Sequence, residues 1–298
     1  MAKDYIIQKA VEFGKVKKKV AAGIDLATFE QQAKYDGCCA ILIFDEYAGY
    51  TKCFSRTGEE YISMSVVGSC MQAWGEKLYG ADTPLRSVAV IGEAWWSGKG
   101  QFNEISGAFR RGKPNYDLGF VINDVIPLDD FRKGYCPTPY RDRVANWKGI
   151  LPDGSEHPFQ FADCWEPGSS DPQERCNQLV AIGGFDGLVL RDLNGTWTVG
   201  SGTTGEIIKI KQKLSFDLKV IEISSAPGEK TGRDVYRLVV EFNGRRLGVG
   251  SGVPHKLADL PKLGDIIEVE AMDLSSDGLL REPRFKGIRY DKIAPDTV

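Results

Sequence analysis

The sequence predicts an α+β domain followed by a small all-β barrel, and two patterns along its 298 residues support this fold class. Before about Lys213, strand-like apolar runs are mixed with segments of helical periodicity. After it, short strand-like runs recur at regular spacing between Gly-rich turns, which is typical of a small β-barrel, and the OB fold suits a segment of this size. The clearest of these runs are Leu218–Ser224, Val235–Phe242, Arg245–Val249 and Ile266–Ala271. We therefore expect an α+β domain over 1–213 and an OB-fold domain over 214–298.

The α+β domain is expected to open with a helix over 2–22, because a rough apolar stripe runs between its lysines. A hairpin should follow, since two strand-like runs, Cys39–Phe44 and Tyr50–Arg56, flank a turn. Asp171-Pro172 and Gly183-Gly184 are start and stop signals of a helix that ends near Ile182. The other expected elements are helices at 66–79, Phe102–Arg111 and Tyr140–Trp147, and strands at Arg86–Trp95, 115–128, Gly187–Arg191 and Ile207–Lys211.

The composition is that of an ordinary globular protein, with 42% hydrophobic and 27% charged residues. The net charge of −3 lacks the overall basic balance that nucleic-acid-binding proteins usually carry. Local clusters at 15–19 and 110–113 still allow one basic face. The charge therefore argues mildly against a nucleic-acid partner without excluding one.

Cysteines and histidines give no sign of a structural metal site. The seven cysteines include no CxxC spacing, and the two histidines lie far apart, so no zinc pattern is present. Scattered cysteines, two of them adjacent at Cys38-Cys39, fit a reducing compartment. No signal-peptide core and no run of about 18 apolar residues is found, so we expect a cytoplasmic protein without a membrane partner.

Lys34 lies in the stretch Ala33–Cys38, directly before an apolar strand. A lysine amine is a nucleophile only when neutral, which requires a dry or electropositive site that lowers its pKa. The Asp36-Gly37 pair favours a tight turn, which could expose Lys34 at a strand end. Lys-x-Asp-Gly also describes many surface hairpins, so these four residues alone identify no site.

Further motifs follow Lys34 in a fixed order along nearly the whole chain. They are Ser55–Gly58, Ile91–Glu93, Leu118–Ile122, Phe185–Arg191, Ile207–Lys211 and Leu280–Lys292. This succession resembles the covalent nucleotidyltransferases, and specifically the small bacteriophage-type ATP-dependent DNA ligases. The resemblance implies a nucleotidyltransferase (adenylation) domain of antiparallel sheets with helices over 1–213, with the OB barrel as a mobile lid over its cleft.

The resemblance also implies a chemistry. Ligases of this family form a lysine–AMP phosphoramidate, transfer AMP to the 5′-phosphate of a nick, and then let the 3′-OH displace it. Lys34 is then the nucleophile, and ATP and Mg²⁺ are the cofactors. Lys209 and Lys211 alternate along a strand and so point to one face. Beside the α-phosphate of ATP they would stabilise developing charge and lower the pKa of Lys34.

Two carboxylates at strand ends, Glu93 and Asp186, match the family's nucleotide and metal residues. Mg²⁺ prefers oxygen ligands, and in the family the first carboxylate contacts the ribose while the second helps to hold metal. Here the second is Asp186 rather than the usual Glu, which makes a water-bridged metal contact plausible. Asp36 is a candidate to align the 3′-OH or the metal, although turn formation explains it equally well.

Aromatic and basic residues complete the set implied by the resemblance. Phe120 aligns with the aromatic that stacks on adenine, although the neighbouring Asn123-Asp124 could shift the register and a core Phe is the alternative. Arg56 resembles the arginine that reads the 5′-phosphate of the nick. Cys39 stands where the family usually has an arginine, which removes one contact to the nucleotide. Two basic segments are assigned more loosely: Arg110 and Arg111 to DNA, and Arg281, Arg284, Arg289 and Lys292 to closure on the pyrophosphate.

The expected function is ATP-dependent sealing of nicks in duplex DNA, as in DNA replication, repair and recombination, by a monomer in the cytoplasm of a phage-infected host. Two other classes stay open at this point. One is an RNA ligase or a GTP-dependent capping-type guanylyltransferase, against which the Leu280–Phe285 segment argues. The other is an OB-fold single-strand binding protein, for which the Lys34, Glu93 and Asp186 set has no use.

Overall fold

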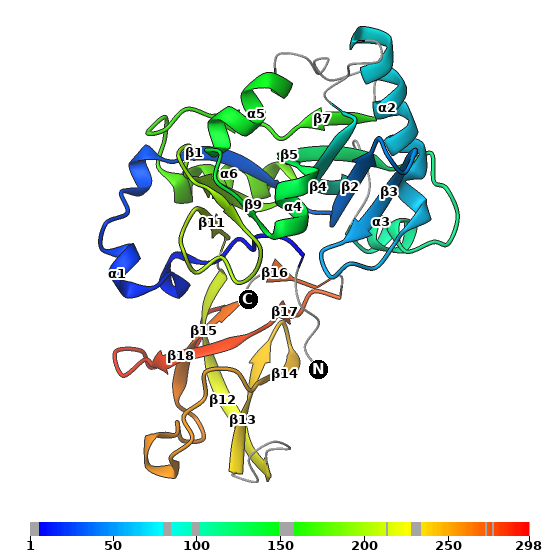
Figure 1. Cartoon of the computed structure of the whole chain (residues 1–298). Helices are drawn as coiled ribbons and strands as arrows, with labels where there is room; N and C mark the ends of the chain where they lie inside the picture. Colours follow the sequence, from blue (N-terminus) through cyan, green and yellow to red (C-terminus); the bar gives the residue numbers. More distant parts are fainter. Residues whose placement is uncertain are drawn as a thin grey trace. The chain divides into compact units, whose positions relative to one another are not determined.

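The structure is a computed structural model that describes residues 6–79, 85–96, 102–148, 158–212, 214–227, 234–271, 273–275 and 277–297. The chain divides into two compact units, Met1–Lys211 and Gln212–Val298 (Figure 1). Among the described residues, no helix has both the length and the apolar character needed to cross a membrane.

The first sheet of the N-terminal unit has five strands in the order β3-β2-β4-β5-β7. All neighbours are antiparallel except the parallel pair β5 and β7. One face packs against α2 (Ser65–Tyr79) and α3 (Phe102–Phe109) in a core that includes Leu42 and Val90. The strands are β2 (Cys38–Asp45), β3 (Tyr50–Ser55), β4 (Ser87–Trp95), β5 (Gly119–Pro127) and β7 (Phe159–Phe161).

The second sheet of this unit has the order β11-β9-β1-β8. Its strands are β1 (Glu30–Tyr35), β8 (Cys164–Trp165), β9 (Phe185–Arg191) and β11 (Ile207–Ile210). Helix α6 (Pro172–Ile182) covers one face and buries Ala33, Leu188 and Ile208 (Figure 1). The Asp171 side chain accepts a hydrogen bond from the Glu174 amide (2.9 Å), and Gly183 ends the helix with φ 89°. Both end signals of this helix are therefore confirmed.

The predicted helix over 2–22 is wrong for the residues described there. The chain forms only a 3₁₀ turn, η1 (Phe13–Lys15), and a short helix, α1 (Lys18–Ala21). Before them it runs alongside β11: the Val11 amide donates to the Ile207 carbonyl (3.2 Å), and the Lys209 amide donates to the Val11 carbonyl (2.9 Å). Pairing with the sheet edge satisfies backbone groups that a helix would otherwise have paired, and it buries Val11. A helix through this segment would also contain Gly14, which would destabilise it by about 1 kcal/mol.

Helix α4 (Leu128–Lys133), strand β6 (Tyr135–Cys136) and helix α5 (Tyr140–Lys148) lie between β5 and β7 in sequence. Helix α4, which the sequence did not predict, leads into β6, which pairs with β10 (Trp197–Thr198). Helix α5 confirms the prediction at 140–147. Trp197 is fully buried beside Phe131.

The C-terminal unit contains a five-stranded antiparallel sheet in the order β14-β13-β12-β15-β18 and a two-stranded sheet, β16-β17. Its core includes Leu218, Val240 and Ile267. The described strands do not close into a barrel, although a parallel bridge joins Ser251 to Arg284 of β18. The OB-fold prediction is therefore not confirmed. The strands are β12 (Leu214–Pro227), β13 (Asp234–Phe242), β14 (Arg245–Val249), β15 (Ile266–Ala271), β16 (Asp273–Leu274), β17 (Leu280–Arg281) and β18 (Arg284–Ile288).

Candidate active site

A β-bulge at the end of β1 brings Lys34 and Asp186 together. Lys34 pairs with Gly187, but Tyr35 pairs with Phe185, so Asp186 is an extra residue in β9. Gly187 has φ 135°, and a Cβ there would lie 2.3 Å from the carbonyl oxygen of Ile210. Only glycine fits this backbone, and the bulge turns the Asp186 side chain to the side on which Lys34 lies.

The Asp186 carboxylate bridges two lysines. Its Oδ2 lies 2.5 Å from Lys34 Nζ, and its Oδ1 lies 2.8 Å from Lys211 Nζ. Ile208 and Ile210 of β11 pack in the core under α6, so the alternating Lys209 lies on the opposite face, the one that carries Lys34. Lys209 and Lys211, which were predicted to point to one face, therefore both lie on the side of the sheet that carries Lys34, and their contact with the α-phosphate stays a prediction.

The charges in this cluster raise the pKa of Lys34, whereas the sequence led us to expect a lowered pKa. Burial lowers the pKa of Lys34, but the charges of Asp186 and Glu93 outweigh it, and the pKa is raised. Burial likewise would raise the pKa of Asp186, yet Lys34 and Lys211 hold it below the usual value. Burial and the neighbouring Lys211 instead lower the pKa of Lys209. Lys34 is therefore an ammonium ion in this state, because a carboxylate lies closer to it than the other lysines do.

Glu93 and Asp36 lie next to this cluster. The Asp36-Gly37 turn packs tightly on β4, since a Cβ on Gly37 would lie 2.3 Å from the Ala94 carbonyl oxygen and 2.8 Å from Glu93 Cγ. Burial raises the pKa of Glu93 to about 7; Asp186 and Asp36 act in the same direction, and Lys34 and Arg56 oppose them. Glu93 therefore belongs to the same electrostatic cluster as Lys34.

We predict that Glu93→Gln stabilises the N-terminal unit at high pH. The pKa of Glu93 is about 7 in the folded protein against an ordinary value of 4.5, so the folded state binds more protons between these two pH values. Its contribution to stability is therefore lost as pH rises from about 4.5 to about 7. Glutamine carries no charge, so the variant should be more stable than wild type at pH 8 by about 2–3 kcal/mol, and by little at pH 4.5.

Denaturant unfolding at both pH values, followed by tryptophan fluorescence, tests this. All six tryptophans lie before Lys211, so their signal reports the N-terminal unit alone. A variant whose stability follows pH just as wild type does would show that Glu93 is not the titrating group.

Phe120 does not lie with these residues. It pairs with Ala94, its side chain is 1% exposed, and it packs in the core under α2 and α3. Val121 is the residue of β5 that shares a face with Glu93. The prediction that Phe120 stacks on adenine therefore does not fit the structure, because its ring lies on the other face of the sheet.

Arg56 and the two cysteines flank the cluster. The exposed Arg56 follows β3, and its charge acts on Glu93. Cys39 pairs with Glu93 across β2 and β4, and burial raises the pKa of its thiol far above the usual range, so the thiol is inert. Burial also raises the pKa of Cys38, while a hydrogen bond with Ser106 and the charge of Arg110 oppose that rise. The charge of the predicted DNA-binding Arg110 therefore acts at the start of β2, and Arg111 next to it is exposed.

Arg289 and Lys292 lie in the C-terminal unit and are ion-paired there. Arg289 Nη1 donates to both carboxylate oxygens of Asp217, at 3.1 and 2.9 Å. Lys292 pairs with the same carboxylate and with Asp296 (3.1 Å). Both side chains thus attach the C-terminal segment to β12.

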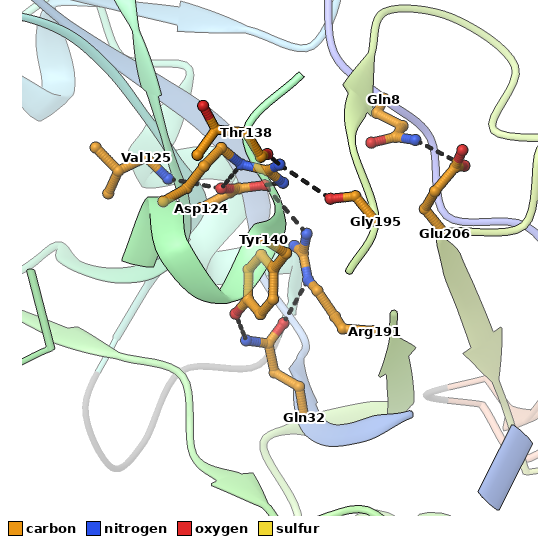
Figure 2. Close-up of polar contacts among 10 residues, drawn as sticks. Gln8, Gln32, Asp124, Val125, Thr138, Tyr140, Arg191, Gly195 and Glu206 are labelled. Carbon is orange, nitrogen blue, oxygen red and sulfur yellow. Dashed lines mark hydrogen bonds and ion pairs between the residues drawn. The ribbon is translucent and has the colours of Figure 1, made fainter. Parts of the chain in front are cut away.

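The sequence did not reveal a buried network centred on Asp124 (Figure 2). The Asp124 carboxylate accepts two hydrogen bonds from Arg143, at 2.9 and 2.7 Å, and one from Arg191 at 3.3 Å. The three side chains are only 1%, 2% and 8% exposed, respectively. One carboxylate therefore neutralises two buried guanidinium groups only in part.

The network extends to the strand that carries Lys34. Arg191 donates to the Gln32 side-chain oxygen, and the Gln32 amide donates to the Tyr140 hydroxyl, both at 3.3 Å (Figure 2). Asp124 lies on β5, whereas Gln32 and Arg191 lie on β1 and β9, so the network joins the two sheets. An acidic residue inside the apolar run of β5 was the signal that could have shown it.

Solved structures share this architecture. The structure "Pmar-Lig_Pre." matches with a TM-score of 0.70 and 22% identity, over 97% of this chain and 68% of its own. A structure from a study of Lig E DNA ligases matches with a TM-score of 0.65 and 19% identity, over 95% of this chain and 98% of its own. The ATP-dependent DNA ligase of bacteriophage T7, in complex with ATP, matches with a TM-score of 0.53 and 18% identity, over 94% of this chain and 98% of its own. The chain has the DNA ligase fold.

No protein-family model and no curated protein sequence matches the chain. The likeness to the DNA ligases therefore lies in the fold. The α+β architecture predicted from the sequence agrees with the ligase fold, except that its first sheet is mixed through the parallel β5–β7 pair.

Proposed function

We propose that this chain is an ATP-dependent DNA ligase that seals nicks between a 5′-phosphate and a 3′-OH in duplex DNA. The observation that carries the proposal is the Asp186 bridge between Lys34 and Lys211, on a sheet face shared with Lys209 and within a ligase fold. A ligase of the same fold has been solved with ATP, which supports ATP as the nucleotide.

In the first step, Lys34 Nζ gives a proton to the Asp186 carboxylate, which passes it to solvent, and the neutral amine attacks the α-phosphorus of ATP. The N–P bond forms, the bond to the β-phosphate oxygen breaks, and pyrophosphate leaves. Lys209 and Lys211 stabilise the negative charge that develops on the α-phosphate oxygens. Because Asp186 holds Lys34 in its charged form, this ion pair must open before the attack.

Mg²⁺ fits these residues only together with the phosphates of a nucleotide. Among the described residues, no group of three or more His, Cys, Asp or Glu side chains could hold a metal by itself. Mg²⁺ is commonly bound by one or two carboxylates plus substrate phosphates, and Asp186 and Glu93 can provide these. When bound there, the ion would neutralise phosphate charge. We assign the ribose contact to Glu93 as well.

In the later steps AMP passes from Lys34 to the 5′-phosphate of the nick, and the 3′-OH then displaces AMP. We assign Arg56 to the 5′-phosphate and Asp36 to the alignment of the 3′-OH. The segment 214–298 of the C-terminal unit is proposed to be an OB fold, which is a partly open five-stranded barrel. Its five-stranded sheet and the Ser251–Arg284 bridge support this. We propose that the protein acts as a monomer on nicked duplex DNA.

Incubation of the protein with labelled ATP, GTP or NAD tests the first step. Label from ATP, with Mg²⁺ present, should stay on the denatured protein and should be released by acid, as a phosphoramidate requires. The labelled protein should then seal a nicked duplex without added ATP. Label only from GTP or NAD would overturn the assignment of ATP, and sealing only of RNA nicks would overturn that of DNA.

We predict that Arg289→Ala and Lys292→Ala slow self-adenylylation by about 10²-fold, as the loss of one interaction with developing charge does. The sealing of a nick that is already adenylylated should change by less than about threefold, because no pyrophosphate leaves in that step. Single-turnover kinetics on the two substrates measures both rates.

Asp217→Asn is the matched control, since it removes the ion pairs that Arg289 and Lys292 make with Asp217 but keeps both cations. If Asp217→Asn slows adenylylation as much as Arg289→Ala does, these residues act by holding the C-terminal segment and not on pyrophosphate.

A further inference from the structure

Lys148 and Cys164 bring two nucleophilic side chains into contact outside the Lys34 cluster. Lys148 ends α5, and Cys164 begins β8, which is an edge strand of the second sheet. The Lys148 ammonium group donates to the Cys164 sulfur and to Glu30 Oε2 of β1, both at 3.4 Å. No step proposed above uses these three residues, so their contact needs another explanation.

The contact combines an accessible sulfur with a more enclosed amine and carboxylate. Cys164 is exposed, whereas the Lys148 and Glu30 side chains are only 30% and 14% exposed. The second carboxylate oxygen, Glu30 Oε1, is buried and has no hydrogen-bond partner among the described residues. A small oxidant can therefore reach the sulfur, and a carboxylate beside the amine can accept a proton from it.

Both nucleophiles are protonated in the resting protein. Burial and the charge of Glu30 raise the pKa of the Cys164 thiol, and the charge of Lys148 opposes that rise. Burial lowers the pKa of Lys148, but the charges of Tyr140 and Glu30 outweigh it, and the pKa is raised. The pair is therefore stable without an oxidant, because only the small thiolate fraction of Cys164 reacts with a peroxide.

We propose that Lys148 and Cys164 are a modification site at which hydrogen peroxide closes a reversible sulfur–nitrogen cross-link. Peroxide oxidises the Cys164 thiol to a sulfenic acid, and one water leaves. Lys148 gives one proton to Glu30, which passes it to solvent, and the neutral amine attacks the sulfur. The S–N bond forms, the S–O bond breaks, and hydroxide leaves as a second water with the other amine proton. The sulfur is oxidised by two electrons, and the peroxide is reduced to two waters.

The position of the pair determines what the cross-link does. Sulfenic acids condense with a neighbouring thiol or nitrogen, and the flexible four-carbon stem of Lys148 lets its amine close the remaining distance. The link would join α5 to β8, whose Cys164 pairs with Gln32 of β1, two residues before Lys34. It would thus restrict local unfolding beside the strand that carries Lys34, as a disulfide does by closing a loop.

Trypsin digestion of the whole protein after peroxide treatment tests the proposal, because no lysine or arginine lies between Lys148 and Arg175. In the untreated protein, trypsin cuts after Lys148 and releases Cys164 on the peptide 149–175. The cross-link blocks that cut, so the treated protein should give one peptide, 144–175, that is lighter by two hydrogen atoms. Dithiothreitol should then restore the cut and a Cys164 thiol that alkylates.

Lys148→Arg is the decisive variant, because it keeps the positive charge beside Glu30 but cannot lose a proton near neutral pH. It should lose the cross-link completely and instead give a sulfenic acid at Cys164 that dimedone traps. Cys70→Ser is the matched control, since it removes another exposed thiol and should form the cross-link as wild type does.

Three results would overturn the proposal. They are a free Lys148 in wild-type protein whose Cys164 is oxidised, a disulfide at Cys164, and a peptide 144–175 that has lost two hydrogen atoms but gained an oxygen. None of these results bears on whether the protein seals nicks, because the inference does not rest on the proposed function.

Discussion

Lys34→Ala and Lys34→Arg are both expected to abolish self-adenylylation and the sealing of a nick that carries no AMP. Alanine has no nucleophile, and arginine keeps the positive charge beside Asp186 but cannot lose its proton near neutral pH. Both variants should retain sealing of a pre-adenylylated nick to within about tenfold, because Lys34 forms no covalent bond in that step. Comparing the two variants separates the role of the amine from the role of its charge.

The fold should survive these substitutions, since Asp186 keeps its ion pair with Lys211. The free energy of unfolding, followed by tryptophan fluorescence, should stay within about 1–2 kcal/mol of the wild-type value. A change of this size is typical for the loss of a half-buried ion pair. Lys133→Ala, at an exposed lysine of α4, is the activity control and should adenylylate as wild type does. Covalent label on a denatured Lys34→Arg protein would place the nucleophile elsewhere.

Asp124→Asn is expected to be the most destabilising single substitution at the candidate site. It leaves Arg143 and Arg191 buried with no carboxylate, and breaking a buried ion pair in this way costs about 3–5 kcal/mol. Typical domains are stable by about 5–15 kcal/mol, so the N-terminal unit should unfold at least several degrees lower or fold incompletely. Asparagine has the same size, so packing alone does not account for the loss.

Asp130→Asn provides the comparison, because Asp130 pairs with Lys133 on the surface at 3.5 Å and should contribute less than about 1 kcal/mol. A second substitution, Arg143→Met, added to Asp124→Asn should recover part of the stability, since it removes one of the unpaired charges. An Asp124→Asn protein with a wild-type melting curve by tryptophan fluorescence would show that the network does not hold the two sheets together.

Local signals predicted the parts of the fold that local interactions determine. Asp171 and Gly183 specify the ends of α6 through contacts within a few residues, and the prediction there is confirmed. The helix expected over 2–22 is wrong because the competing partner of Val11 is Ile207, almost 200 residues away in the chain. Periodicity alone carries no information on such a partner.

The candidate site shows the same division. Lys34, Asp186 and Lys211 were identified from motif order, and the structure places them in contact. Phe120 was matched to the adenine-stacking aromatic by resemblance, with a core Phe as the alternative, and the structure places it in the core. Because β5 is buried on both faces, its sequence does not show which face Phe120 occupies. In the sequence, Asp124 was noted only because it could shift the alignment of Phe120. Its role in the buried network was missed, because Arg143 and Arg191 approach it only in the folded chain.

The ion pair between Lys34 and Asp186 should also protect Lys34 from chemical modification when no nucleotide is bound. An ammonium group has no lone pair, so cyanate, acyl phosphates and carbon dioxide cannot modify Lys34 while the pair is closed. The most reactive amine of the working site would thus be among the least reactive amines of the resting protein. We expect exposed lysines such as Lys133 to react with a limiting dose of cyanate before Lys34 does, a result that peptide mass spectrometry would show directly.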